Sequence, residues 1–194
     1  MTVLRRVVWV LGVVAALAVV GTSAAALVLD DDAEQPRLTL RGSGVSATLP
    51  AAHWRIAPPD TGIVYRDADG RRLVGLTGPA VYREGACVSD RTLSRAFAGF
   101  VPRSGRPLRT VARAWAEAAT LDVTTGRPTG PVRLRVSEDR VDADVGVPPG
   151  PCNPARQHLT VVAAGDQALV LLRDVGVAGA LPQEAAEEIV DSVR

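Results

Sequence analysis

The sequence predicts an α+β domain, in which helices pack on an antiparallel β-sheet, preceded by one N-terminal transmembrane helix. Three features predict this arrangement. Short segments alternate apolar and polar residues around turns that contain Gly or Asp, two later segments have helical spacing of their apolar residues, and an uncharged apolar run stands near the N-terminus. Strands and helices that share one core in this way form packed layers.

The apolar run covers residues 7–29, follows Arg5 and Arg6, and stops at Asp30. About 20 apolar residues cross a bilayer core of roughly 30 Å, and the flanking arginines orient the N-terminus toward the cytoplasm. The alternative is a signal peptide that is cleaved at the small residues 24–26. We favour the uncleaved anchor because the apolar run continues past that point. Both alternatives export everything that follows.

The chain is therefore expected to contain a cytoplasmic N-terminus (1–6), a transmembrane helix or signal anchor (7–29), a linker (30–44) and one extracytoplasmic domain (45–194). We expect a single-pass cell-membrane protein, or a secreted one if the signal is cleaved. Because 22 Lys and Arg face 21 Asp and Glu, no excess charge points to nucleic acid as a partner.

The first half of the domain contains several strand segments. Residues 45–49 alternate and end at a proline, and residues 54–57 form a second short strand segment. Residues 62–66 and 71–76 flank an Asp-Ala-Asp-Gly turn, so we expect them to form a hairpin. The turn lacks the further ligands of a calcium loop, and we interpret it as a turn alone.

The middle of the chain is harder to assign. Residues 89–100 give no clear strand or helix pattern, and a Gly/Pro-rich loop leads from them to residue 109. Thr110 is suited to cap a helix that continues through Leu121. Val111 and Trp115 fall on one face of that helix, where we expect them to contribute to the core.

Residues 132–136 and 141–147 show the clearest alternation, and four residues connect them. They predict an antiparallel hairpin with one solvated face, on which Arg135 lies opposite Asp142. Residues 158–164 and 167–174 form another hairpin around Gly165-Asp166. Both of its faces are apolar, so it is expected in the middle of the sheet.

The final segment predicts a helix that starts at Pro182 and buries Ile189 and Val190. Together with the helix in the middle of the chain, it completes the predicted layers on the sheet.

Cys87 and Cys152 are the only cysteines. In an exported domain such an even pair predicts a disulfide, which would close a loop of about 66 residues. A metal site needs more Cys or His ligands at close spacing than this chain offers. We therefore expect neither a metal nor another cofactor.

No catalytic residues are assigned from the sequence. Only His53 and His158 are conventional bases, and the nucleophile motifs of hydrolases and proteases are absent. Paired carboxylates remain a chemical option, but nothing in the sequence places two of them at a working separation. We expect a non-enzymatic protein, with an exported hydrolase that uses a carboxylate or His base as the alternative.

Six arginines lie close together in the sequence, and arginine suits phosphate or carboxylate ligands. The first five of them are the candidate ligand-binding residues; the six are Arg91, Arg95, Arg103, Arg106, Arg109 and Arg113. The alternative is that they are simply solvated surface charges. If they do act together, an anionic envelope component or another envelope protein is the expected partner.

Several pieces of the chain resemble a known group of proteins. They include Leu49-Pro50 with Trp54, Gly78-Pro79-Ala80, Ala114-Trp115-Ala116 and Cys152-Asn153-Pro154. They are similar to actinobacterial membrane-anchored proteins whose exported domain has no known function. The Leu-Pro-x-x-x-Trp opening and the order of the elements also look similar to the PsbP-like fold of exported lipoproteins, a layered sandwich. The chain lacks a lipobox cysteine, so lipid attachment is not implied. The resemblance implies an extracytoplasmic binding or scaffold domain.

Overall fold

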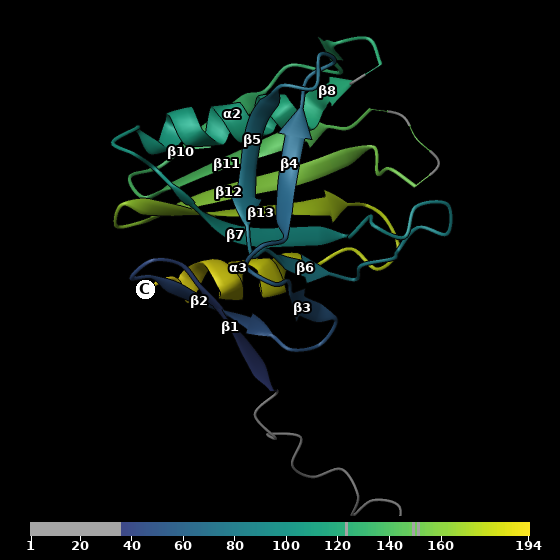
Figure 1. Cartoon of the computed structure of the whole chain (residues 1–194). Helices are drawn as coiled ribbons and strands as arrows, with labels where there is room; N and C mark the ends of the chain where they lie inside the picture. The colour runs from purple at the N-terminus through teal and green to yellow at the C-terminus, as the bar shows by residue number, and fades with distance from the viewer. Residues whose placement is uncertain (1–35, 123, 149, 151) are drawn as a thin grey trace, which may run out of the picture. The chain divides into compact units, whose positions relative to one another are not determined.

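A seven-stranded antiparallel sheet forms the centre of the structure, a computed structural model that describes residues 36–122, 124–148, 150 and 152–194 (Figure 1). From one edge to the other, its strands are β10 (Arg133–Val136), β11 (Arg140–Gly146), β12 (Arg156–Ala164), β13 (Gln167–Val175), β7 (Ala96–Pro102), β6 (Ala80–Tyr82) and β3 (Trp54–Ile56).

Three two-stranded sheets and two helices complete the described part of the chain. The strand pairs are β1 (Arg37–Arg41) with β2 (Ser46–Pro50), β4 (Gly62–Arg66) with β5 (Arg72–Thr77), and β8 (Leu121–Asp122) with β9 (Arg127–Pro128); the helices are α2 (Leu108–Thr120) and α3 (Gln183–Asp191). The β4–β5 hairpin crosses the strands of the large sheet instead of extending it (Figure 1).

The predicted α+β class, with its PsbP-like layered sandwich, is wrong. The described residues are mostly β-structure, and the two helices have only 13 and 9 residues. The sequence did predict these two helices, but it underestimated the amount of strand. The missing strands are short segments such as β1, β6 and β9. β1 falls in the predicted linker, and β6 and β9 have only three and two residues, too few to show a periodicity.

The two C-terminal hairpins are confirmed. In the β10–β11 hairpin Arg135 is the partner of Asp142, as the alternation predicts. In the β12–β13 hairpin the two apolar faces contribute to two different cores. Leu159 and Val161 pack in the core on the α2 side, whereas Val162 and Leu169 pack in the core that contains α3 residues. This pair of strands therefore lies inside the sheet and is covered on both faces.

Other predictions need adjustment at their boundaries. Residues 89–100, which gave no clear pattern, contain the start of β7, one of the central strands. Helix α2 begins at Leu108 after Pro107, so Thr110 lies within its first turn and does not cap it. The last helix follows Pro182 as expected. Residues 37–41, which were predicted to belong to the linker, form β1.

Residues 36–194 form one compact unit by their contacts. The predicted anchor at 7–29 lies outside the described residues. Within the part that the structure describes, neither helix is both long and apolar enough to span a bilayer.

Candidate functional site

A groove of about 810 Å³ lies where five segments of the chain meet. The β1–β2 turn and the segment after β3 contribute to it, together with the ends of β5 and β7 and the β12–β13 turn. Residues from these segments are Arg41, Ser43, Ala57, Thr77, Phe100 and Gln167. This volume is in the range of sites that hold small molecules or short peptide segments.

The walls of the groove combine apolar surface with neutral polar groups. Ile56 and Phe100 are partly exposed apolar side chains, and Thr77 adds a hydroxyl. Arg41 and Asp166 are exposed and bring one charge of each sign. Such a surface suits a ligand with alternating apolar and polar groups better than a strongly charged one.

Gly42 sets the position of the β1–β2 turn against the large sheet. A Cβ atom at this residue would lie 2.6 Å from Gln167 Oε1 and 2.9 Å from Phe100 Cγ, so a side chain does not fit there. Gln167 Nε2 also donates to the carbonyl oxygen of Ser43 at 2.8 Å. These contacts fix one end of the groove.

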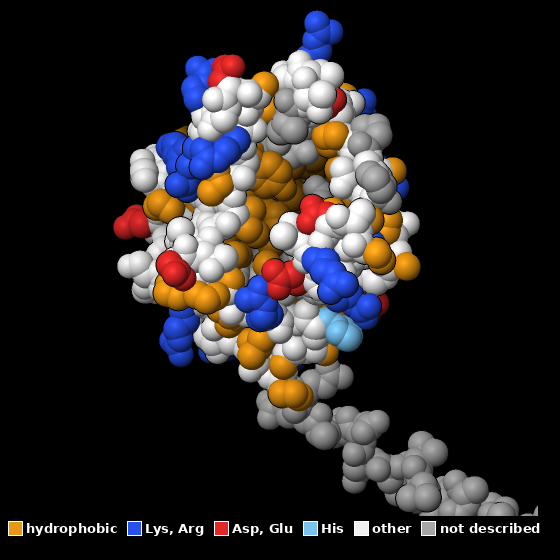
Figure 2. Space-filling view, turned by 45° about the vertical axis from the view of Figure 1, so that its right-hand side comes forward, with side chains coloured by type: hydrophobic (Ala, Val, Ile, Leu, Met, Phe, Trp, Pro, Cys, Tyr) orange, Lys and Arg blue, Asp and Glu red, His pale blue; other side chains and the backbone are white. Residues whose placement is uncertain are grey.

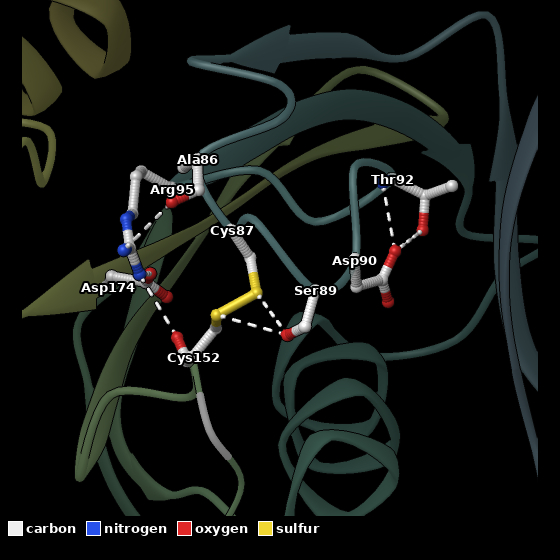
Figure 3. The surroundings of a disulfide bond; sticks show 8 residues. All are labelled: Ala86, Cys87, Ser89, Asp90, Thr92, Arg95, Cys152 and Asp174. Atoms are coloured by element: carbon white, nitrogen blue, oxygen red, sulfur yellow. Dashed lines mark hydrogen bonds and ion pairs between the residues drawn. A yellow bond between two sulfur atoms is a disulfide. The ribbon is translucent and has the colours of Figure 1, made fainter.

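The predicted disulfide between Cys87 and Cys152 is present, with 5.6 Å between the Cα atoms (Figure 3). It joins the loop before β7 to the loop before β12. The Ser89 hydroxyl lies 3.0 Å from Cys87 Sγ. Nearby, Asp90 accepts hydrogen bonds from both the backbone N–H and the hydroxyl of Thr92, which lowers the pKa of its carboxyl. The loop therefore has a defined local structure.

Arg95 lies beside the disulfide and makes a buried ion pair with Asp174 (Figure 3). Arg95 Nη1 is 3.0 Å from Asp174 Oδ2 and also donates to the carbonyl oxygen of Cys152. The second carboxylate oxygen of Asp174 accepts from Gln157 Nε2 at 2.9 Å. Burial nevertheless raises the pKa of Asp174, against the effect of its hydrogen bonds and of Arg95. Arg95 therefore has a structural role, since its guanidinium binds groups inside the fold.

The structure does not bring the five candidate arginines together. Arg95 precedes β7 and Arg103 follows it; eight residues of extended chain place them about 26 Å apart. Arg91 is exposed on the disulfide-linked loop, on the side of Arg95. Arg103 and Arg106 donate to backbone carbonyls of their own turn, and Arg109 is exposed in the first turn of α2.

Arg106 has two neighbours that the sequence did not suggest. Together with Arg72 of β5 and Trp115 of α2 it lines a small cavity of about 230 Å³ beside the β4–β5 hairpin. A third cavity of about 570 Å³ adjoins it, because Leu73, Val74 and Ala114 line both, and it includes Asp67 of the hairpin turn and Glu117 of α2. The hairpin is therefore bordered by two cavities.

Hydrophobic side chains also reach the surface elsewhere. Figure 2 shows a hollow on one face, with hydrophobic side chains on its floor and charged side chains around it.

Tyr65 of β4 is largely covered: its ring packs edge-on against Trp115, with 6.0 Å between the ring centroids. Burial raises the pKa of Tyr65 to about 12, with a smaller effect of the nearby Asp174 carboxylate. The phenol is therefore neutral at physiological pH.

His158 lies between two carboxylates on the polar part of the sheet. Its Nε2 is 3.2 Å from Asp142 Oδ1, and its Nδ1 is 3.0 Å from Asp144 Oδ1. The hydrogen bond to Asp142 is the main cause that raises the pKa of His158, although burial and Arg173 oppose it. The protonated imidazole, which donates from both nitrogens, is the form that suits these contacts.

Asp142 is the centre of this polar network. Burial opposes its ionisation, but hydrogen bonds from His158, Arg140 and Thr160 hold its pKa well below the usual range. Arg140 also pairs with Glu187 of α3, so the network connects the sheet with that helix. Its ion pairs differ from the simple cross-strand pattern, since Arg135 contacts Asp144 and not Asp142.

The other histidine, His53, precedes β3 and packs edge-on against Tyr82, with 6.0 Å between the ring centroids. Within the described residues, no group of three or more His, Cys, Asp and Glu side chains could hold a metal ion.

Residues 41–194 match the model of a protein family described as "Domain of unknown function (DUF8017)". The match covers more than half of the chain. The chain belongs to this family. A search of curated proteins gives no match. For DUF8017 the family model thus defines the extent of a domain but assigns no activity. The buried ion pair and the polar network lie within the matched segment, and so does the groove except for Thr39 and Leu40 of β1.

Sequence reasoning missed most of the residues that line the groove in this DUF8017 domain. Gln167 was assigned to a hairpin and Arg41 and Ser43 to the linker, whereas Thr77 follows the predicted hairpin of residues 62–76 and was not assigned. Only the tertiary fold brings these segments together. One signal was present in the sequence: Gly42 and Gly44 flank Ser43, which is typical of a tight connection between two short strands.

Proposed function

We propose that residues 36–194 act as a non-enzymatic binding domain, exposed on the outer face of the cell membrane and anchored there by residues 7–29. The observation that carries this proposal is the groove of about 810 Å³, whose walls come from five separate segments and combine apolar and neutral polar groups. Binding sites in proteins are typically concave and built in this way. The actinobacterial envelope is the expected setting, from the resemblance described above.

The polar network supports binding over hydrolysis. His158 is the better buried of the two conventional bases, and both of its ring nitrogens contact carboxylates. A general base needs a free nitrogen within reach of the proton that it removes. His53, the second conventional base, packs against Tyr82.

The short connection between the predicted anchor and the groove also favours a ligand near the membrane surface. Nine residues, and hence ten steps along the chain, separate Leu29, at the end of the predicted anchor, from Thr39 at the groove. Such a segment spans at most about 36 Å when fully extended. Two partner classes are expected from the sequence: an anionic envelope component and another envelope protein. Because the candidate arginines are spread over both ends of β7 and the groove is nearly neutral, we propose the second class.

Site-specific photo-cross-linking in living cells tests this proposal. A benzoylphenylalanine replaces Thr77 in the groove of the full-length protein, and in a control it replaces Thr110, which is exposed on α2. We expect a discrete adduct from position 77 and none from position 110. A second substitution, Ser43→Trp, fills the groove and removes the adduct. Equal adducts at both positions, or none at either, would contradict a ligand site in the groove.

A further inference from the structure

We propose that the groove receives an extended polypeptide segment, which adds to the outer edge of β1 as a further strand. This inference rests on the proposed function, since it names the ligand class of the same groove. Its basis is the hydrogen-bonding state of two strand edges that border the groove, one on β1 and one on β7.

The first edge belongs to β1. Gly42 N–H donates to the Val45 carbonyl, which makes Arg41 and Ser46 a pair whose own backbone groups point away from each other. Ser46 confirms this direction, because its N–H and C=O both bond to Arg194 on the far side of β2. By alternation, the N–H and C=O groups of Thr39 and Arg41 point outward on the opposite side. Within the described residues these groups have no hydrogen-bond partner.

Thr39 and Arg41 both line the groove. Their outward N–H and C=O groups therefore lie along its wall, at the spacing of alternate residues in a strand. Unpaired strand edges of this kind are templates for another strand. β1 has five residues, so it offers about 17 Å of edge.

The second edge belongs to β7. Arg103 N–H donates to the Asp166 carbonyl, and Asp174 N–H donates to the Arg95 carbonyl. With the register between β13 and β7, these bonds direct the backbone groups of Gly99 and Val101 toward β13. Those of Phe100 point to the other side.

On that other side, β6 has already ended. It pairs with β7 only from Ala96 to Ala98, so the backbone N–H and C=O of Phe100 have no partner within the described residues. Phe100 lines the groove as well. The groove thus has unpaired backbone donors and acceptors on two of its walls.

An extended peptide is the ligand that matches these walls. It carries N–H and C=O groups at the period of two residues that the edge of β1 requires. Its alternate side chains would lie over Phe100 and Ile56, which favours apolar residues at these positions. The intervening side chains would lie beside Arg41, whose charge favours a carboxylate. Because Asp166 also lines the groove, the proposed partner is a protein segment with apolar residues at alternate positions, neutral polar residues between them and a single acidic residue beside Arg41.

The experiment uses the full-length protein in detergent micelles. Peptides that bind it are selected from a displayed library of random heptapeptides, and the tightest binder is then synthesised with single N-methyl groups at each amide. Strand addition predicts that the effect of N-methylation on binding alternates from one peptide residue to the next. Methylation of the amides that face β1 weakens binding at least tenfold, whereas methylation of the intervening amides has little effect. Because only the peptide is changed, the fold of the protein is not disturbed.

Two protein variants locate the peptide. Ser43→Trp, which fills the groove, abolishes binding. Thr39→Pro removes one outward N–H group but no bond between β1 and β2, and it weakens binding, while the control Thr39→Val does not. Thermal unfolding of each variant shows whether it is folded.

Each outcome decides the proposal. The proposal is supported if the effect of N-methylation alternates along the peptide and binding is lost in Ser43→Trp. A library without binders overturns strand addition, and so does groove binding without this alternation. In these two cases the proposed function stands if position 77 still gives its cross-link in cells. An alternation that persists in Ser43→Trp would place the peptide at another edge, and the inference would be wrong.

Discussion

Replacement of Arg95 by methionine is expected to destabilise the domain strongly. The side chains of Arg95 and Asp174 are only 16% and 3% exposed, respectively. Removal of one partner from such a buried pair leaves the other charge without compensation, at a cost of about 3–5 kcal/mol. Arg95 also donates to the carbonyl oxygens of Cys152 and Ala86, and these acceptors would lose a donor.

The chain provides a matched control. Arg55 pairs with Glu84 at the surface, where the two side chains are 51% and 41% exposed. Exposed pairs of this kind contribute about 0–1 kcal/mol, so Arg55→Met should have a small effect. Asp174→Asn leaves the Arg95 charge without its carboxylate, but it should cost less than Arg95→Met, because Arg95 is the more exposed partner and the amide oxygen can still accept a hydrogen bond from it.

The assay is equilibrium urea unfolding of the full-length protein, followed by the fluorescence of the buried Trp54 and Trp115. In Arg95→Met the loss should be smaller at acidic pH. Burial already raises the pKa of Asp174, and without Arg95 the carboxyl becomes protonated more readily, which removes the unpaired charge. If Arg95→Met cost no more than Arg55→Met, burial of the pair would not determine its contribution and the reasoning would be refuted.

Three further perturbations test the disulfide, the histidine and the anchor. Replacement of both Cys87 and Cys152 by alanine should lower the free energy of unfolding by up to about 4 kcal/mol, because the bond closes a loop with a sequence separation of 65; urea unfolding measures this, and an unchanged midpoint would contradict it. Since hydrogen bonding to Asp142 raises the pKa of His158, its contribution to stability is complete below the pKa of an unfolded histidine and is lost as the pH rises through the folded pKa. His158→Gln should abolish this part of the pH profile, and an identical profile in the variant would show that another group is responsible. Finally, the full-length protein should remain in the membrane fraction at full mass after carbonate washing, because residues 7–29 are uncharged; a shortened soluble form that begins near Leu27 would show cleavage instead.

The parts of the fold that the sequence predicts well are those determined by neighbouring residues. The β10–β11 register follows from alternation across a short connection, and Arg135 does lie opposite Asp142. The two apolar faces of β12 and β13 predicted a position inside the sheet, which the two cores confirm. The disulfide could be predicted because Cys87 and Cys152 are the only cysteines.

Other features depend on contacts between distant residues. β2 lies between β1 and the C-terminal residue Arg194, which pairs with Ser46 across almost the whole domain. No local pattern indicates such a partner. The underestimate of strand has the same origin: a three-residue strand such as β6 is defined by its neighbours in the sheet and not by its own sequence.

The proposed peptide site combines both kinds of information. Whether a strand edge is open depends on where its neighbour ends. β6 stops pairing at Ala80 while β7 continues to Pro102, and β1 has β2 on one side only. The sequence alone therefore predicts several of the strands but does not predict which of their edges remain unpaired. The edges become visible only when the register is known, because the register decides which backbone groups of Thr39, Arg41 and Phe100 point toward the groove.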